Sequence, residues 1–249
     1  MISIAVLAED ELGFRLVDHL TDQVMLEIDW VERDSLGQLR SWWAAPDEGD
    51  QRIRWTSIDR LFKKTFGDRA RLHTKWGAPT ALDEVQLRKF FLLLQISEQA
   101  PALAIVARDT DHRDRKTADG GRYAGLRAAR EISRWSFAIV GAFAVPAAEA
   151  WLICSWCPAN EPERRTLALL RQELGLDPVR ASHELESTGA KKRHCKSVLG
   201  RLESDGRSAW DAFAGMTARD LEAEGEHNGL TDFIREVRAE LHRRLGAAP

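Results

Sequence analysis

Residues 102–107 read ALAIVA and lead directly into Arg108, Asp109, Thr110 and Asp111. A short, continuous apolar run that ends at charged residues is typical of a strand buried on both faces of a parallel sheet. The acids then lie at the carboxyl end of the strand, where open α/β sheets bind their ligands. This stretch therefore predicts an α/β fold and indicates which edge of the sheet carries function.

Two further apolar runs have the same character. Residues 2–8 end at Glu9, and residues 137–145 are followed by Pro146, which favours the first turn of a helix. A weaker strand is expected at residues 24–28. Helical spacing separates these runs, so the order predicts a mainly parallel central sheet with helices on both faces.

Apolar residues at helical spacing predict helices between and after the strands. They are expected at residues 12–20, 58–66, 82–99, 123–134, 146–156, 163–175, 194–203, 208–214, 217–224 and 231–245. The rest of residues 30–80 is expected to be an irregular insertion rich in tryptophan and arginine. We expect residues 1–157 to form the α/β domain and residues 158–249 a helical C-terminal region packed on it.

The composition is that of a globular protein, with 44% apolar and 30% charged residues among 249. The net charge of −3 gives no global attraction to nucleic acid, so such binding needs a local basic patch. Three cysteines are too few for a disulfide scaffold. With no signal peptide and no apolar run of about 18 residues, we expect a cytoplasmic protein without membrane contact. The oligomeric state stays open.

Acidic side chains follow each of the three clear strands. Glu9 follows the first, Asp109 and Asp111 follow the second, and Glu149 lies in the first turn of the helix after the third. Carboxylates held together repel one another unless a cation or proton lies between them, and Mg²⁺ or Mn²⁺ prefers such oxygen ligands. In an extended chain residues i and i+2 point to the same side, so Asp109 and Asp111 are expected to share one ion. Alternatively, these acids cap helices and line solvated loops.

Basic residues near the acids and in the tail are the candidates for binding phosphate and nucleic acid. The phosphate-binding candidates are Arg113, Arg115, Lys116 and Arg122. The candidates for nucleic-acid contact are Lys191, Lys192, Arg193 and Lys196. Short basic runs of this kind also occur as solvated faces without a partner.

The acidic pattern resembles that of TOPRIM domains, which occur in topoisomerases, primases and OLD-type nucleases. A first strand ends at Glu9, a later strand ends in Asp109-x-Asp111, and a third element reads EAWL from Glu149. The resemblance covers about residues 1–157 and is strongest to small bacterial TOPRIM-like proteins. The family has glycine directly after its first glutamate, whereas here the glycine is displaced to Gly13.

The resemblance implies an Mg²⁺-dependent (or Mn²⁺-dependent) nuclease that hydrolyses DNA or RNA, in a phage-defence or mobile-element setting. Glu9 would act as general acid or base, and Asp109 and Asp111 would be catalytic metal ligands. Glu9 and Glu149 would complete the metal site.

Three alternatives belong to other classes. The chain could be a non-catalytic TOPRIM-like binding or effector subunit, with nucleic acid or a protein from the same operon as partner. A receiver domain needs a buried strand ending near Asp59, which the sequence lacks there. A zinc site could use the CxxC of Cys154 and Cys157 with His194 and Cys195, but a cysteine inside an apolar helix is more typical of a core residue.

Overall fold

The computed structural model describes residues 1–44, 52–68, 72, 81, 83–111, 121–131, 134–188 and 192–246. The chain divides into two compact units. Unit 1 comprises Met1–Ala107, Arg113–Gly141 and Glu236–Pro249, and unit 2 comprises Arg108–His112 and Ala142–Arg235. Residue 157, the expected domain boundary, lies within unit 2.

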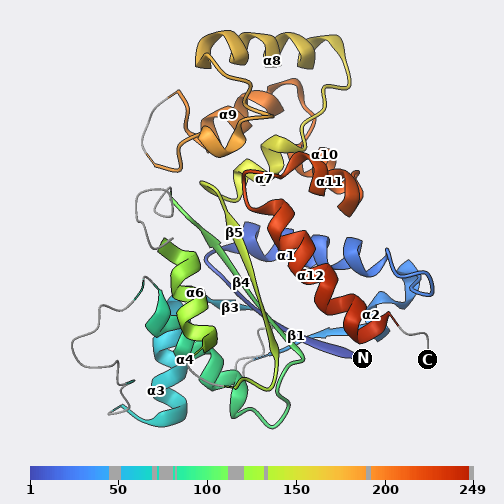
Figure 1. Ribbon diagram of the computed structural model, residues 1–249. Coiled ribbons are helices and arrows are strands. Elements are labelled where there is room, and N and C mark those ends of the chain that lie inside the picture. Colours follow the sequence, from blue (N-terminus) through green and yellow to red (C-terminus); the bar gives the residue numbers. More distant parts are fainter. Residues whose placement is uncertain are drawn as a thin grey trace. The chain divides into compact units, whose positions relative to one another are not determined.

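A five-stranded sheet carries the fold, with the order β2-β1-β4-β5 and with β3 also paired to β1 (Figure 1). The strands are β1 (Ile2–Ala8), β2 (Arg40–Trp42), β3 (Ile53–Arg54), β4 (Leu103–Asp109) and β5 (Ala138–Ala144). β2, β3 and β4 all run parallel to β1. The sequence prediction of an α/β fold with a mainly parallel sheet is therefore confirmed.

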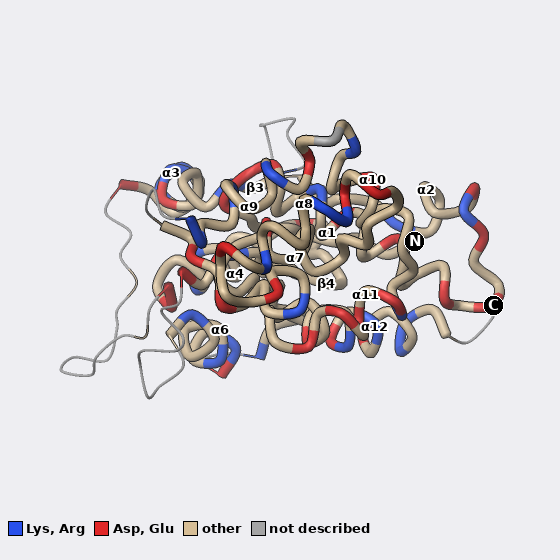
Figure 2. Tube along the Cα trace, turned by 90° about the horizontal axis from the view of Figure 1, so that it is seen from above, with Lys and Arg blue, Asp and Glu red and all other residues tan. Residues whose placement is uncertain are grey.

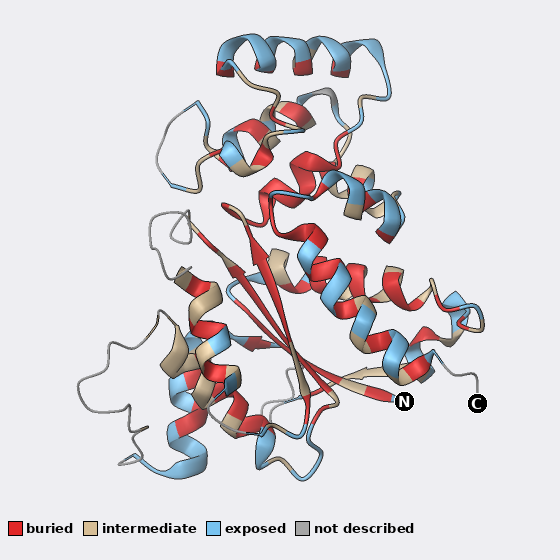
Figure 3. Ribbon diagram, in the orientation of Figure 1, coloured by how far each residue is buried: buried red, intermediate tan, exposed pale blue. Residues whose placement is uncertain are grey.

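The two central strands are buried because apolar residues occupy nearly every position. Ile4–Ala8 in β1 and Leu103–Ala107 in β4 are at most 6% exposed, and they pair in register from Ile4 opposite Leu103 to Ala8 opposite Ala107. Continuous burial on both faces is the pattern of a parallel strand covered by helices. Figure 3 shows both strands as buried through most of their length.

Helices cover both faces of the sheet in unit 1. They are α1 (Glu11–Met25), α2 (Leu36–Leu39), α3 (Ile58–Phe66), α4 (Glu84–Gln95), α6 (Gly121–Glu131) and the end of α12 (Leu230–Leu245). Figure 1 shows α1 on one side of the sheet and α3, α4 and α6 on the other. The chain moves one way from β1 to β2 and the other way from β4 to β5, and connections of the usual right-handed kind then place their helices on opposite faces.

The outer edge of β5 is covered by side chains in unit 1. Arg130 of α6 donates to the carbonyl oxygen of Ile139 at 2.6 Å, and Glu236 of α12 accepts from the backbone N–H of Gly141 at 3.3 Å. Arg130 and Glu236 also form an ion pair at 3.0 Å. Groups bonded in this way are not available for pairing with another chain.

Unit 2 is mostly helical. Its helices are α7 (Glu149–Cys154), α8 (Glu161–Leu174), α9 (Cys195–Leu202), α10 (Ala209–Ala214), α11 (Ala218–Glu224) and the start of α12. All six residues of α7 are buried, and Trp151 stacks on Phe233 with ring centroids 5.8 Å apart. Because α7 contacts α9 and α10, it is the core helix of this unit.

The helices expected from residue 163 onward are confirmed within about two residues, as is the helix at 58–66. The helix expected at 146–156 covers only Glu149–Cys154 and does not begin at Pro146. The strand expected at residues 24–28 is wrong. Those residues end α1, which continues through Val24 and Met25 on its buried face. β2 and β3 were not expected within the insertion at 30–80, because each has at most three residues.

Charged residues of both signs are interspersed along the described helices (Figure 2). α8, for example, carries Glu161, Glu163, Arg164 and Arg165 within its first two turns. This distribution agrees with the small net charge of −3.

Candidate functional site

Acidic residues follow β1 and end β4 in the chain. β1 and β4 run parallel with Ala8 opposite Ala107, so both strands end at the same edge. Glu9 follows β1 in unit 1 and is exposed to solvent. Asp109, Asp111 and Glu149 belong to unit 2. The role of Glu9 in a shared site stays a prediction.

Asp109 is the last residue of β4 and contacts the start of α7. Its Oδ1 accepts a hydrogen bond from the backbone N–H of Ala148 at 2.8 Å, and Ala148 directly precedes Glu149. The neighbouring N–H of Thr110 donates to the carbonyl oxygen of Ala144 at 2.9 Å. These bonds fix the end of β4 beside the first turn of α7. Asp109 therefore lies next to the backbone of the residue that precedes Glu149.

Glu149 is 8% exposed, and a lysine from another helix reaches it. The Nζ of Lys196, in the first turn of α9, lies 3.6 Å from Oε1 of Glu149. A carboxylate this buried is costly unless a positive group compensates it, and Lys196 is such a group.

The charges of both acids act on the thiol of Cys195. Burial raises the pKa of Cys195 to about 12, and the negative charges of Glu149 and Asp109 add to that increase. Both carboxylates therefore act on one buried point, and the thiol stays protonated at neutral pH. The structure thus brings together Asp109, Glu149, Cys195 and Lys196.

Asp111 does not continue the strand. Its backbone is in the left-handed region, with φ of 52°, and its N–H donates to the carbonyl oxygen of Pro146 at 3.0 Å. Aspartate tolerates this conformation better than most residues. The argument that Asp109 and Asp111 point to the same side assumed extended backbone, which β4 provides only as far as Asp109.

The donor chemistry of Asp109 and Glu149 fits a hard cation. Across the part of the chain that the structure describes, no group of three or more His, Cys, Asp or Glu side chains is arranged to hold a metal ion. Mg²⁺, however, is commonly held by one or two carboxylates while water and phosphate oxygens complete its shell. A protonated, soft thiol at Cys195 adds nothing to such a site.

The predicted phosphate-binding residues divide into two groups. Arg113, Arg115 and Lys116 lie outside the described residues. Arg122 is 2% exposed, and its Nη1 bonds Oδ2 of Asp83 at 2.7 Å in unit 1. A phosphate would therefore compete with Asp83 for Arg122.

The basic run of the tail has acidic and carbonyl partners. Lys191 lies outside the described residues. Arg193 donates to the carbonyl oxygen of Leu174 at 2.7 Å, and the positive charge of Lys192 helps Arg201 lower the pKa of Glu173. Lys192, Arg193 and Lys196 are nevertheless exposed, so nucleic-acid contact by them stays a prediction.

The cysteines of the CxxC differ in environment. Cys154 is buried in α7, where desolvation raises the pKa of its thiol to about 12, whereas Cys157 is exposed. Cys154 also donates to the carbonyl oxygen of Trp151 at 3.2 Å. These features are those of a core cysteine, as the sequence interpretation favoured.

Sequence reasoning missed the pairing of Lys196 with Glu149 and the position of Cys195. Lys196 was assigned to a basic run because its neighbours are basic, and no local pattern links it to an acid 47 positions earlier (196 − 149). It also missed a small cavity in unit 1, lined by Val6, Phe14, Asp18, Trp42 and Arg52.

Comparison of the chain with protein-family models, with curated proteins and with solved structures gives no match. Among the helices of the described residues, none combines the length and apolar character that crossing a bilayer requires.

Proposed function

We propose that the chain is an Mg²⁺-dependent (or Mn²⁺-dependent) nuclease with a TOPRIM-like α/β domain, in which Asp109 and Glu149 hold the cation. The observation that carries the proposal is the hydrogen bond from the N–H of Ala148, directly before Glu149, to Asp109 at the exit of β4, with Lys196 paired to Glu149. In α/β sheets this edge is the usual place for ligands.

The local charges support a site for a phosphate and a cation together. Asp109 and Glu149 supply two negative charges, and the exposed ammonium of Lys196 supplies one positive charge 3.6 Å from Glu149. A cation held by the acids would free Lys196 to contact a phosphate oxygen of the nucleic acid. Lys196 is 70% exposed at its side chain, so it can reorient toward solvent.

Each residue has a distinct part in the proposal. Asp109 supplies one carboxylate, oriented by the N–H of Ala148. Glu149 supplies the second carboxylate from the rigid, buried α7. Bound Mg²⁺ would neutralise phosphate charge and lower the pKa of a water molecule. Glu9 is the proposed general acid or base, on the TOPRIM resemblance.

A second function is favoured by the same contacts when they are taken as structural. Asp109 already accepts from the first turn of α7, and Glu149 is already paired with Lys196. Acids satisfied in this way can serve the fold alone. The chain would then be a non-catalytic binding or effector subunit, acting through nucleic acid or a protein partner.

The test is cleavage of labelled single-stranded DNA, duplex DNA and RNA with Mg²⁺, with Mn²⁺ and with a chelator. Asp109→Asn keeps an oxygen for the Ala148 N–H but removes the charge, and Glu149→Gln does the same at α7. Each should reduce cleavage by about 100-fold or more, since even partners of metal ligands are worth about 10- to 100-fold. The matched control is Glu226→Gln, at an exposed acid of unit 2.

Full activity of both variants would refute the assignment of these ligands. Calorimetry separates the two functions. Mg²⁺ binding that is lost in Asp109→Asn supports the nuclease. No heat with Mg²⁺, together with stable oligonucleotide binding and no cleavage, supports the non-catalytic subunit.

A further inference from the structure

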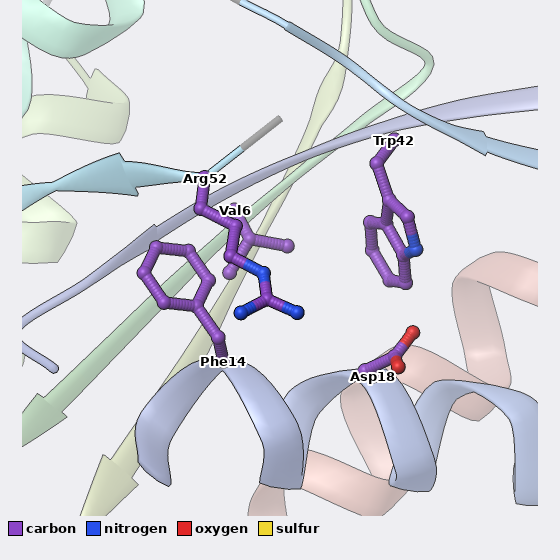
Figure 4. A pocket seen from close by; sticks show the side chains of 5 residues that line it. All are labelled: Val6, Phe14, Asp18, Trp42 and Arg52. Atoms are coloured by element: carbon purple, nitrogen blue, oxygen red, sulfur yellow. The ribbon is translucent and has the colours of Figure 1, made fainter. Parts of the chain in front are cut away.

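A small cavity lies in unit 1 beside β1, at the point where the pairing of β1 changes from β2 to β3. Ile2–Ile4 of β1 pair with β2, whereas Leu7 and Ala8 pair with β3. β2 ends at Trp42, and β3 begins at Ile53. The cavity has a volume of about 70 Å³ and is lined by Val6, Phe14, Asp18, Trp42 and Arg52 (Figure 4).

Two aromatic rings form apolar walls. Phe14 projects from α1 and Trp42 from β2, and Figure 4 shows both rings beside the space that the Arg52 guanidinium enters. Arg40 lies 4.5 Å from the centroid of the Trp42 ring and bonds Oδ1 of Asp18 at 3.0 Å. These contacts position Trp42 and Asp18 before any ligand arrives.

The cavity also presents an acceptor and a donor. Asp18 rises from α1 on one side, and Arg52 enters from the start of β3 on the other (Figure 4). An ionised carboxylate has about four acceptor positions, so Arg40 leaves capacity for a further donor. The guanidinium of Arg52 pairs with Glu11 and lies 5.8 Å from the Phe14 ring centroid.

The Asp18 side chain is 50% exposed, and Arg40 is its ion-pair partner. Desolvation raises the pKa of Asp18 and outweighs the opposing effect of Arg40. An N–H donor from a ligand would restore what burial removes.

The charges select the class of ligand. A simple anion in the cavity would meet the carboxylate of Asp18, and a simple cation would meet the guanidinium of Arg52. A flat neutral group with an N–H beside a C=O satisfies both residues and stacks against Phe14 and Trp42. About 70 Å³ admits the edge of such a ring while the remainder projects outward.

We propose that this cavity binds the lactam edge of a nucleobase, the adjacent N–H and C=O found in uracil, thymine and guanine. Asp18 accepts from the ring N–H, and Arg52 donates to the carbonyl oxygen. The inference stands independently of the proposed nuclease activity, because every residue it uses belongs to unit 1.

The test is a titration of the full chain with uridine and guanosine, followed by NMR of the Trp42 indole N–H. The Trp42 signal is assigned from the spectrum of Trp42→Phe. Both nucleosides should shift it with a Kd on the order of 1 mM, a modest affinity suited to a partly enclosed ring. 3-Methyluridine, which lacks the ring N–H, should bind at least about tenfold more weakly, since Asp18 then has no donor.

Arg52→Gln is the matched variant, because Arg52 is 49% exposed at its side chain and its replacement leaves the core intact. Uridine should bind this variant about tenfold more weakly. Comparing uridine monophosphate with single-stranded oligouridylate shows whether the base comes from a free nucleotide or from a strand. Three results would overturn the proposal. They are a Trp42 signal that stays unchanged up to about 10 mM nucleoside, binding of 3-methyluridine as tight as that of uridine, and a signal that shifts with methylguanidine but with neither nucleoside.

Discussion

Replacing Arg122 with alanine tests whether the main role of this residue is to stabilise unit 1 or to bind a phosphate. Its Nη1 lies 2.7 Å from Oδ2 of Asp83, and the two side chains are 3% and 12% exposed. Removal of one partner from a pair this buried leaves an uncompensated charge, which costs about 3–5 kcal/mol. Arg122→Ala should therefore lower the free energy of unfolding by that amount. A residue whose main role is phosphate contact would cost less than about 0.5 kcal/mol, as surface substitutions do.

The assay is urea denaturation followed by tryptophan fluorescence, with Asp83→Asn as the matched variant. Asp83 has a φ of 66°, a conformation that asparagine adopts as readily as aspartate, so this change removes charge without adding backbone strain. The double variant should be less destabilised than the sum of the two single variants, because neither charge is then left alone. Additive effects, or a cost for Arg122→Ala within about 0.5 kcal/mol, would refute the reasoning.

Four further predictions concern packing and thiols. A Cβ on Gly225 would lie 2.5 Å from Cβ of Leu230, so Gly225→Ala should cost about 1–3 kcal/mol. At Gly37 a Cβ meets no atom of the described residues within 4 Å, so Gly37→Ala should stabilise by about 0.4–1 kcal/mol, and thermal melting that reverses the two signs would contradict both. The buried thiols of Cys154 and Cys195 have pKa values of about 12, so they stay protonated in the folded state when unfolded thiols ionise above pH 9. Stability should consequently fall between about pH 9 and 12, by up to about 1.4 kcal/mol per pH unit for each thiol, and urea midpoints that do not move over this range would count against it. Exposed Cys157 should react quickly with a disulfide reagent in the folded protein while the two buried cysteines do not, which counting the released chromophore will show.

The sheet could be predicted because the burial of its central strands is visible in their apolar sequences. ALAIVA at residues 102–107 is apolar at every position, and only a strand covered on both faces needs that. β2 and β3 could not be found in this way. Each has at most three residues and is defined by its pairing with β1, and a local pattern cannot express a pairing partner.

The site was predictable as far as local geometry determines it. Asp109 and Glu149 could be placed at the sheet edge because each follows a clear strand. Asp111 could not, because its left-handed backbone and its bond to Pro146 leave no local pattern in the sequence. The same holds for Lys196, which reaches Glu149 through the packing of α9 on α7.

The most direct test of the central claim is an NMR titration with Mn²⁺, which broadens signals close to the bound ion. If Asp109 and Glu149 hold the cation, the amides of Thr110, Ala148 and Cys195 should broaden first, and Asp109→Asn should abolish the effect. Broadening that begins elsewhere in the chain, or that persists unchanged in Asp109→Asn, would contradict the account.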